Sequence, residues 1–79
     1  MKYRLNSELE IEAIQYNAND DEIKEWSHGV INDRKYGTLV FSNDAGINYV
    51  GPEDWIIKVD GEYYMVDNVI FTKFFTKSC

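Results

Sequence analysis

The chain has 79 residues, of which 44% are hydrophobic and 15% aromatic, and its formal net charge is −6. This length predicts a single domain over residues 1–79, without a linker, near the lower size at which a hydrophobic core alone can stabilise a fold. The negative charge disfavours direct binding to a nucleic-acid backbone or an anionic membrane, because both depend on Lys and Arg side chains.

Two further features concern location and redox chemistry. No apolar run approaches the roughly 18 residues of a membrane-spanning helix, and the first residues lack the apolar segment of a secretory signal. We therefore expect a soluble, intracellular protein. Cys79 is the one cysteine, so an internal disulfide cannot form and the cysteine count provides no metal-ligand pattern.

The first predicted strand covers residues 9–16. Apolar and acidic side chains alternate through its first half: Leu9, Glu10, Ile11, Glu12 and Ala13. The apolar positions then change parity at Ile14 and Tyr16, which indicates either a bulge or a segment covered on both faces. We favour coverage on both faces, with the following helix as the cover.

A short helix is predicted after Asn19. Asn19 suits the N-cap position, and Glu22, three residues later, completes a capping-box pattern. Asp20, Asp21 and Glu22 also place negative charge at the positive end of the helix dipole.

The same helix has an apolar face and a stop signal. Ile23 and Trp26 are three residues apart, so they share one face and should pack on a sheet. His28 falls in the last turn, where its charge would be favourable, and Gly29 suits the left-handed position that ends a helix.

The remainder of the chain alternates strand patterns with turn residues. Asp60-Gly61 is a strong hairpin signal, because a type I′ turn needs positive φ at both positions. The terminal segment is predicted as a strand or as a helical turn followed by a strand. The predicted segments are residues 36–41, 47–50, 55–59, 62–66 and 69–76.

The predicted fold class follows from this order of elements. One early helix among short strands gives the order β-α-β-β-β-β-β, which is typical of an α+β fold. We predict a single small domain with a curved antiparallel sheet and one short helix packed on it.

Three blocks of sequence resemble a family of small phage and prophage proteins. The blocks are Met1-Lys2-Tyr3-Arg4, Ile11-Glu12-Ala13-Ile14-Gln15-Tyr16, and Asp54-Trp55-Ile56-Ile57-Lys58 with Gly61-Glu62-Tyr63-Tyr64. They are similar, in the same order, to the family's MKYR-like start and its VEAIQF- and PGDWIIKG-GEFY-like motifs. Ile70-Phe71 followed by Phe75 resembles its terminal DIF…Y element. The resemblance spans almost the whole chain and implies a phage or prophage origin rather than a chemical activity.

The chain also departs from the family pattern. Asn6-Ser7-Glu8-Leu9-Glu10 replaces a Pro-Val-Val lead, Pro52-Glu53-Asp54 replaces Pro-Gly-Asp, and Met65-Val66-Asp67 stands where Cys-Lys-Pro is usual. These changes affect an inherited binding surface more than the fold.

The residue types that could support catalysis or metal binding do not form a known pattern. A Ser-His-Asp site would pair His28 with Ser27 or Ser42, but neither serine has a nucleophile-elbow sequence, and helix neighbours point apart. Oxygen ligands at 43–44 or 53–54 could hold a cation, but no twelve-residue calcium loop is present. We therefore predict a protein that is not an enzyme, and we assign no catalytic, cofactor-binding or metal-binding residue.

The aromatic residues have two interpretations. Tyr63 and Tyr64 are neighbours in a predicted strand, so they face opposite sides and one can be exposed. Trp55, Tyr63 and Tyr64 would form a recognition surface if exposed, but core packing is the default. Stacking on nucleobases is disfavoured by the acidic charge.

The leading functional hypothesis is a non-enzymatic phage protein that inhibits a host protein. The target would be an antiviral-defence component with a basic or nucleic-acid-binding surface, such as a CRISPR nuclease, in the cytoplasm of the infected bacterial host. Carboxylates would stand in for phosphates in a basic cleft while an aromatic residue anchors the contact. The candidate partner-binding residues are Glu10, Glu12, Tyr16, Asp20, Asp21, Glu22 and Trp26.

Two alternatives stay open. An oligomeric phage protein could sequester a small signalling nucleotide between subunits, with Arg4, Arg34 and Lys35 at the interface. A minor structural or assembly protein of the virion is the other alternative. In each case an exposed strand edge, with the terminal strand as the candidate, would allow a homodimer by sheet extension.

Overall fold

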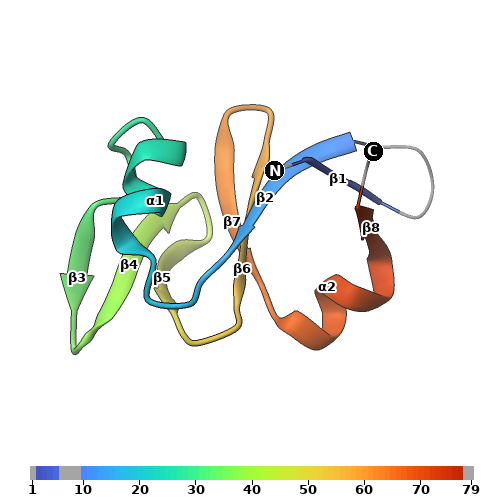
Figure 1. The fold of residues 1–79 in the computed structure, drawn as a ribbon. Helices are drawn as coiled ribbons and strands as arrows, with labels where there is room; N and C mark the ends of the chain where they lie inside the picture. Colours follow the sequence, from blue (N-terminus) through green and yellow to red (C-terminus); the bar gives the residue numbers. More distant parts are fainter. Residues whose placement is uncertain (1, 6–9, 78–79) are drawn as a thin grey trace.

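Two antiparallel sheets form the framework of the computed structural model, which describes residues 2–5 and 10–77 (Figure 1). The larger sheet has five strands in the order β7-β6-β2-β1-β8, and the smaller sheet has the order β3-β4-β5. The elements are β1 (Lys2–Leu5), β2 (Glu10–Gln15), α1 (Asp20–Trp26), β3 (Asp33–Lys35), β4 (Thr38–Asn43), β5 (Gly46–Val50), β6 (Trp55–Val59), β7 (Glu62–Val66), α2 (Asn68–Phe74) and β8 (Phe75–Lys77).

The predicted α+β class is confirmed, but the predicted order of elements is wrong. The chain has two sheets instead of one curved sheet, and α2 is a second helix. The turn over residues 51–54 carries the chain from β5 of the smaller sheet to β6 of the larger sheet. A turn signal is local, so it does not report whether the flanking strands pair with each other.

Strands β1 and β3 lie outside the predicted order for a physical reason. All three residues of β3 are exposed, so no alternation of apolar and polar side chains marks it. Strand β1 is placed by pairing with β2 and β8, contacts that its four residues do not encode locally.

Helix α2 follows the second of the two alternatives for the terminal segment, a helical turn and then a strand. The Asp67 carboxylate accepts hydrogen bonds from the backbone N–H of Val69 at 2.8 Å and of Ile70 at 3.2 Å. These donors have no partner within the helix, so Asp67 is the cap that starts α2.

Strand β2 separates two hydrophobic cores, which confirms the prediction that it is covered on both faces. Ile11 and Ala13 belong to one core, and Ile14 and Tyr16 belong to the other. The β2–β6 register runs without interruption from Glu12 to Gln15, so a bulge does not cause the change of parity. Helix α1 and the smaller sheet cover one face, and α2 covers the other (Figure 1).

Aromatic stacking builds the core beneath α2. Phe71 is 2% exposed, and its ring stacks on Trp55 with 3.8 Å between centroids and 4° between planes. Phe75 stacks on the other side of Phe71 at 4.6 Å. The Trp55 indole N–H donates to the Asn68 side-chain oxygen at 2.8 Å, which satisfies the polar end of a buried ring. Trp55 is therefore a core residue.

The two ends of α1 differ in detail from the prediction. Asn19 is the N-cap residue, but its side chain makes no capping bond to the helix backbone. Its amide Nδ2 instead donates to the Glu22 carboxylate at 2.6 Å, and its oxygen accepts from Asn17 N–H at 2.8 Å. The capping box is therefore not formed, because the two side chains bind each other.

At the other end, both His28 and Gly29 take the left-handed conformation, with φ of 55° and 83° respectively. The Gly29 N–H donates to Lys24 O at 2.8 Å and the His28 N–H to Glu25 O at 3.1 Å. This pair of bonds is a Schellman motif with His28 at the C′ position. The expected αL cap is present, one residue earlier than predicted.

The Asp60-Gly61 hairpin is confirmed, with φ of 52° and 80°. It joins β6 to β7, an edge strand of the larger sheet. Asn43 of β4 donates its amide to the Tyr63 carbonyl at 2.9 Å, which covers part of that edge. Strand β8 lies at the other edge, and homodimerisation through it stays a prediction.

Candidate functional site

The outward side of α1 carries a group of exposed carboxylates. Ile23 is fully buried and fixes which side of the helix faces the core. Asp21 and Glu25, two residues to each side, therefore point outward together with Glu22, and all three are exposed. We call Asp21, Glu22 and Glu25 the α1 acidic face.

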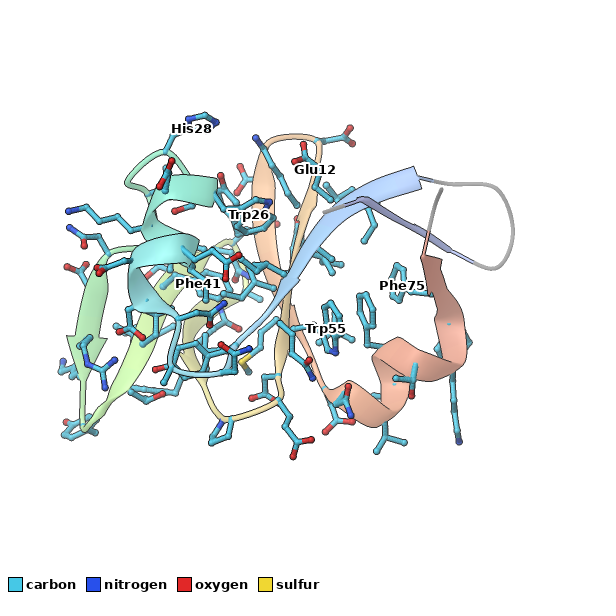
Figure 2. The ribbon with its side chains drawn as sticks, in the orientation of Figure 1. Glu12, Trp26, His28, Phe41, Trp55 and Phe75 are labelled. Carbon is cyan, nitrogen blue, oxygen red and sulfur yellow. The ribbon has the colours of Figure 1, made fainter. Side chains whose placement is uncertain are left out.

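An open depression lies over this part of the helix. Its volume is about 450 Å³, and it is lined by Asp21, Lys24, Glu25, His28 and Gly29. Figure 2 shows His28 projecting from the end of α1. Asp21 and Glu25 are four residues apart, and such like-charge pairs weaken a helix by roughly 0.2–0.5 kcal/mol. The like charges of the α1 acidic face therefore lower the stability of the helix slightly.

Glu25 was missed as a partner-binding candidate, as were Lys24, His28 and Gly29, which line the depression together with Asp21. The i, i+4 spacing of Asp21 and Glu25 around the apolar Ile23 is the sequence signal that would have found it. His28 and Gly29 carry no comparable signal, because their place in the depression depends on the turn after α1.

Asp20 does not share the exposure of the acidic face, because it forms an ion pair with Arg34 of β3. Arg34 also donates to the Tyr16 hydroxyl at 3.2 Å and to the Gly37 carbonyl at 2.8 Å. The hydrogen bond to Tyr16 is the largest cause that raises the pKa of the Arg34 guanidinium above its ordinary value, followed by the hydrogen bond to Asp20 and the charge of Asp20. The charge of Asp20 is therefore offset within the molecule.

Tyr16, a predicted anchor, lies in the core that α1 covers and is 6% exposed. Its ring packs inside, and only its hydroxyl, which accepts from Arg34, reaches toward the surface. This position follows from the change of parity in β2, which turns residues 14 and 16 toward α1. The ring is not displayed to a partner in this conformation.

Trp26, the other predicted anchor, is half-buried at the edge of the same core. Its ring meets Tyr63 edge-on, with 5.5 Å between centroids and 67° between planes. Figure 2 shows the side chain between α1 and the strands of the larger sheet. Its indole Nε1 is buried without a hydrogen-bond acceptor among the described residues, an arrangement that costs free energy.

The two glutamates predicted on β2 are set apart from α1. Glu12 is exposed and lies directly across from Lys58 of β6, so an opposite charge is its cross-strand neighbour. Glu10 begins β2, and its side chain lies outside the described residues. The fold therefore brings together Asp20, Asp21, Glu22 and Trp26 on one helix, and places Glu10 and Glu12 on another element.

Tyr63 and Tyr64 face opposite sides, as predicted. Tyr63 is 7% exposed and belongs to the core, whereas Tyr64 is half-buried. Asp44 is the main cause that raises the pKa of the Tyr64 hydroxyl, with smaller contributions from burial, Glu62 and Asp60.

Of the two serines considered for a nucleophile, Ser27 is fully buried and Ser42 is exposed on β4. The contacts of Ser27 show its role. Its hydroxyl donates to Lys24 O at 3.2 Å and accepts from the Ile31 N–H at 3.0 Å. These bonds close the turn after α1, so the side chain has a structural role.

Each of the two segments considered for a cation uses one of its side-chain oxygens in a turn. Asn43 Oδ1 accepts from the Ala45 N–H at 2.9 Å, and Asp54 Oδ2 accepts from the Gly51 N–H at 2.9 Å. Among the described residues, no group of three His, Cys, Asp or Glu side chains is placed to hold a metal ion. No helix in the described part of the chain could span a membrane.

The basic residues named for a nucleotide site make separate contacts. Arg34 is engaged with Asp20, Tyr16 and Gly37, and the Lys35 ammonium lies 5.8 Å from the centroid of the Tyr36 ring. The Arg4 side chain lies outside the described residues.

No protein-family model, curated protein or solved structure matches this chain.

Proposed function

We propose that this protein is a small, non-enzymatic binding protein of bacteriophage origin that inhibits a host protein in the cytoplasm of the infected cell. The target is an antiviral-defence component, such as a CRISPR nuclease, with a basic surface that normally holds nucleic acid. The α1 acidic face is the observation that carries this proposal. The resemblance of the sequence motifs to small phage proteins supports the origin.

The mechanism is occlusion of a basic cleft by carboxylates that stand in for phosphates. Asp21, Glu22 and Glu25 are exposed on a helix whose Ile23 is buried, so the charges are presented from a fixed position. Such a charged surface steers a basic partner and raises the association rate most strongly at low salt. Asp20 contributes less, because Arg34 already neutralises it.

Trp26 is the aromatic residue that suits the anchor role. It is half-buried and belongs to the same helix as the acidic face, whereas Tyr16 is in the core. Aromatic residues at the centre of a contact carry much of the binding energy, and Trp26 would contribute its remaining exposed edge.

The first test is an affinity pull-down from a lysate of the bacterial host, with the enriched protein identified by mass spectrometry. Binding of the purified target is then compared between the wild type and the variant Asp21→Asn/Glu22→Gln/Glu25→Gln. A matched control, Asp44→Asn/Asp60→Asn/Glu62→Gln, removes the same number of charges from exposed positions elsewhere. We expect the α1 variant to weaken binding by about tenfold or more and the control by much less.

Equal binding by the α1 variant and the wild type would contradict the occlusion mechanism. Equal weakening by both variants would assign the effect to net charge and not to the α1 surface. Copurification with virions, without a host partner, would favour the assembly protein instead.

A further inference from the structure

The outer face of the smaller sheet carries exposed apolar side chains, and no other described element packs over it. Residues alternate along β4 and β5, so Leu39, Phe41 and Val50 face the core while Val40 and Tyr49, which are paired, face outward. Ile47 shares the outward side and is 60% exposed, and Tyr49 is 42% exposed. We call the outward side chains the β3–β5 outer face; they are Asp33, Lys35, Thr38, Val40, Ser42, Ile47 and Tyr49, with Tyr36 at the β3–β4 turn.

Tyr36 extends this face in an unusual conformation. It has φ of 54° and is followed by Gly37 with φ of 78°, which are the signs of a type I′ turn. That turn favours Asn, Asp or Gly at its first position, because a large side chain is strained there. Tyr36 is nevertheless 83% exposed, and its ring lies 6.0 Å from that of Tyr49. A strained, exposed aromatic residue is an observation that points to contact with another molecule.

The charge of this sheet differs from that of the whole protein. Between residues 33 and 50, Asp33 and Asp44 are matched by Arg34 and Lys35, so the segment is neutral in a chain of net charge −6. A neutral apolar face offers no electrostatic attraction to a basic partner, and it places no like-charge barrier against a second copy of itself.

We propose that the β3–β5 outer face is the contact between two copies of this chain, packed face to face about a twofold axis. In such a contact both copies use the same surface, so a residue pair that meets once across the interface meets a second time with the copies exchanged. Asp33 and Lys35 share the outer face two residues apart, so an antiparallel approach places Lys35 of one copy against Asp33 of the other, twice. This dimer uses neither β8 nor the α1 acidic face, and it does not depend on the proposed inhibitor function.

The experiment is sedimentation equilibrium of the full chain over a range of concentrations. We expect a reversible dimer for the wild type. Tyr49→Lys should raise its dissociation constant about tenfold or more, since aromatic residues at the centre of an interface dominate its affinity. Ile47→Lys serves as a second variant, and circular dichroism confirms that each variant is folded. Ile70→Lys, on the exposed face of α2 where Ile70 is 51% exposed, is the matched control and should leave the constant unchanged.

A charge reversal tests the twofold geometry directly. Lys35→Asp should weaken the dimer, because two acidic patches then face each other, and Asp33→Lys/Lys35→Asp should restore it by exchanging the pair. Lys24→Asp makes the same change in net charge on α1 and should have no specific effect. The proposal is overturned by a wild type that is monomeric at millimolar concentration, by a dimer that Ile70→Lys but not Tyr49→Lys disrupts, or by a charge exchange that does not restore affinity.

Discussion

The hydroxyl of Tyr63 donates a hydrogen bond to the backbone carbonyl of Ser27 at 3.3 Å. This bond joins β7 to the turn at the end of α1, while the ion pair of Arg34 with Asp20 joins β3 to its beginning. Together with the buried Ile23, the two links hold the helix against both sheets. The direction of the α1 acidic face is therefore set by contacts with residues distant in the sequence.

Replacing Tyr63 with Phe should lower the free energy of unfolding by about 1 kcal/mol, because it removes one buried hydrogen bond while keeping the ring. Urea denaturation of the purified protein measures this change. Tyr64→Phe is the matched control: its ring is half-buried on the other side of β7, so its effect should be smaller. Similar losses in both variants would contradict the role of the Tyr63–Ser27 bond.

Ser27→Ala should lower the free energy of unfolding by about 1–3 kcal/mol, because the buried Ile31 N–H loses its acceptor. Amide hydrogen exchange should become faster at Ile31, and denaturation reports the total loss. Ser42→Ala removes an exposed hydroxyl and should change stability by less than about 0.5 kcal/mol. A stable Ser27→Ala variant would argue against the structural role of this side chain.

Phe71→Ala should cost about 3–5 kcal/mol, because it leaves a cavity between Trp55 and Phe75. That is a large share of the stability of a small domain, so the near-ultraviolet circular dichroism of the variant should be weak or lost. Phe71→Leu keeps most of the volume and should remain folded with a lower melting temperature. Phe74→Ala, at a position 53% exposed on the same helix, should have a much smaller effect.

Asp44→Asn should lower the pKa of Tyr64, because Asp44 is the largest cause of its rise above 10.0. Ultraviolet absorption or NMR titration of the tyrosines measures the pKa, and added salt should reduce the difference between variant and wild type. Tyr64 keeps its proton to higher pH in the folded than in the unfolded chain. Its contribution to stability is thus complete below the unfolded pKa and is lost as the pH rises through the folded pKa. An unchanged Tyr64 pKa in the variant would contradict this assignment.

Local patterns were sufficient for several elements. The position of α1 follows from the spacing of Ile23 and Trp26, and the β6–β7 hairpin follows from Asp60-Gly61, because both depend on neighbouring residues alone. The change of parity within β2 correctly predicted coverage on both faces. The acidic residues of α1 were also evident as a group, although Glu25 was missed.

Other features could not be predicted because they depend on distant contacts. Arg34 was considered for a ligand site, but the fold places it against Asp20 and Tyr16, fourteen and eighteen residues away. Tyr16 was considered an anchor, but packing of α1 over β2 buries it.

Helix α1, the β6–β7 hairpin, the α+β class and a surface rich in carboxylates can be predicted from the sequence alone, because they depend on short-range periodicity, turn residues and composition. Only the tertiary structure decided that the strands divide into two sheets, that β1 and β8 pair, and that Tyr36 and Tyr49 meet on an exposed face. The reason is physical: pairing of strands and burial of side chains depend on which distant segments meet, and that choice is made by the chain as a whole.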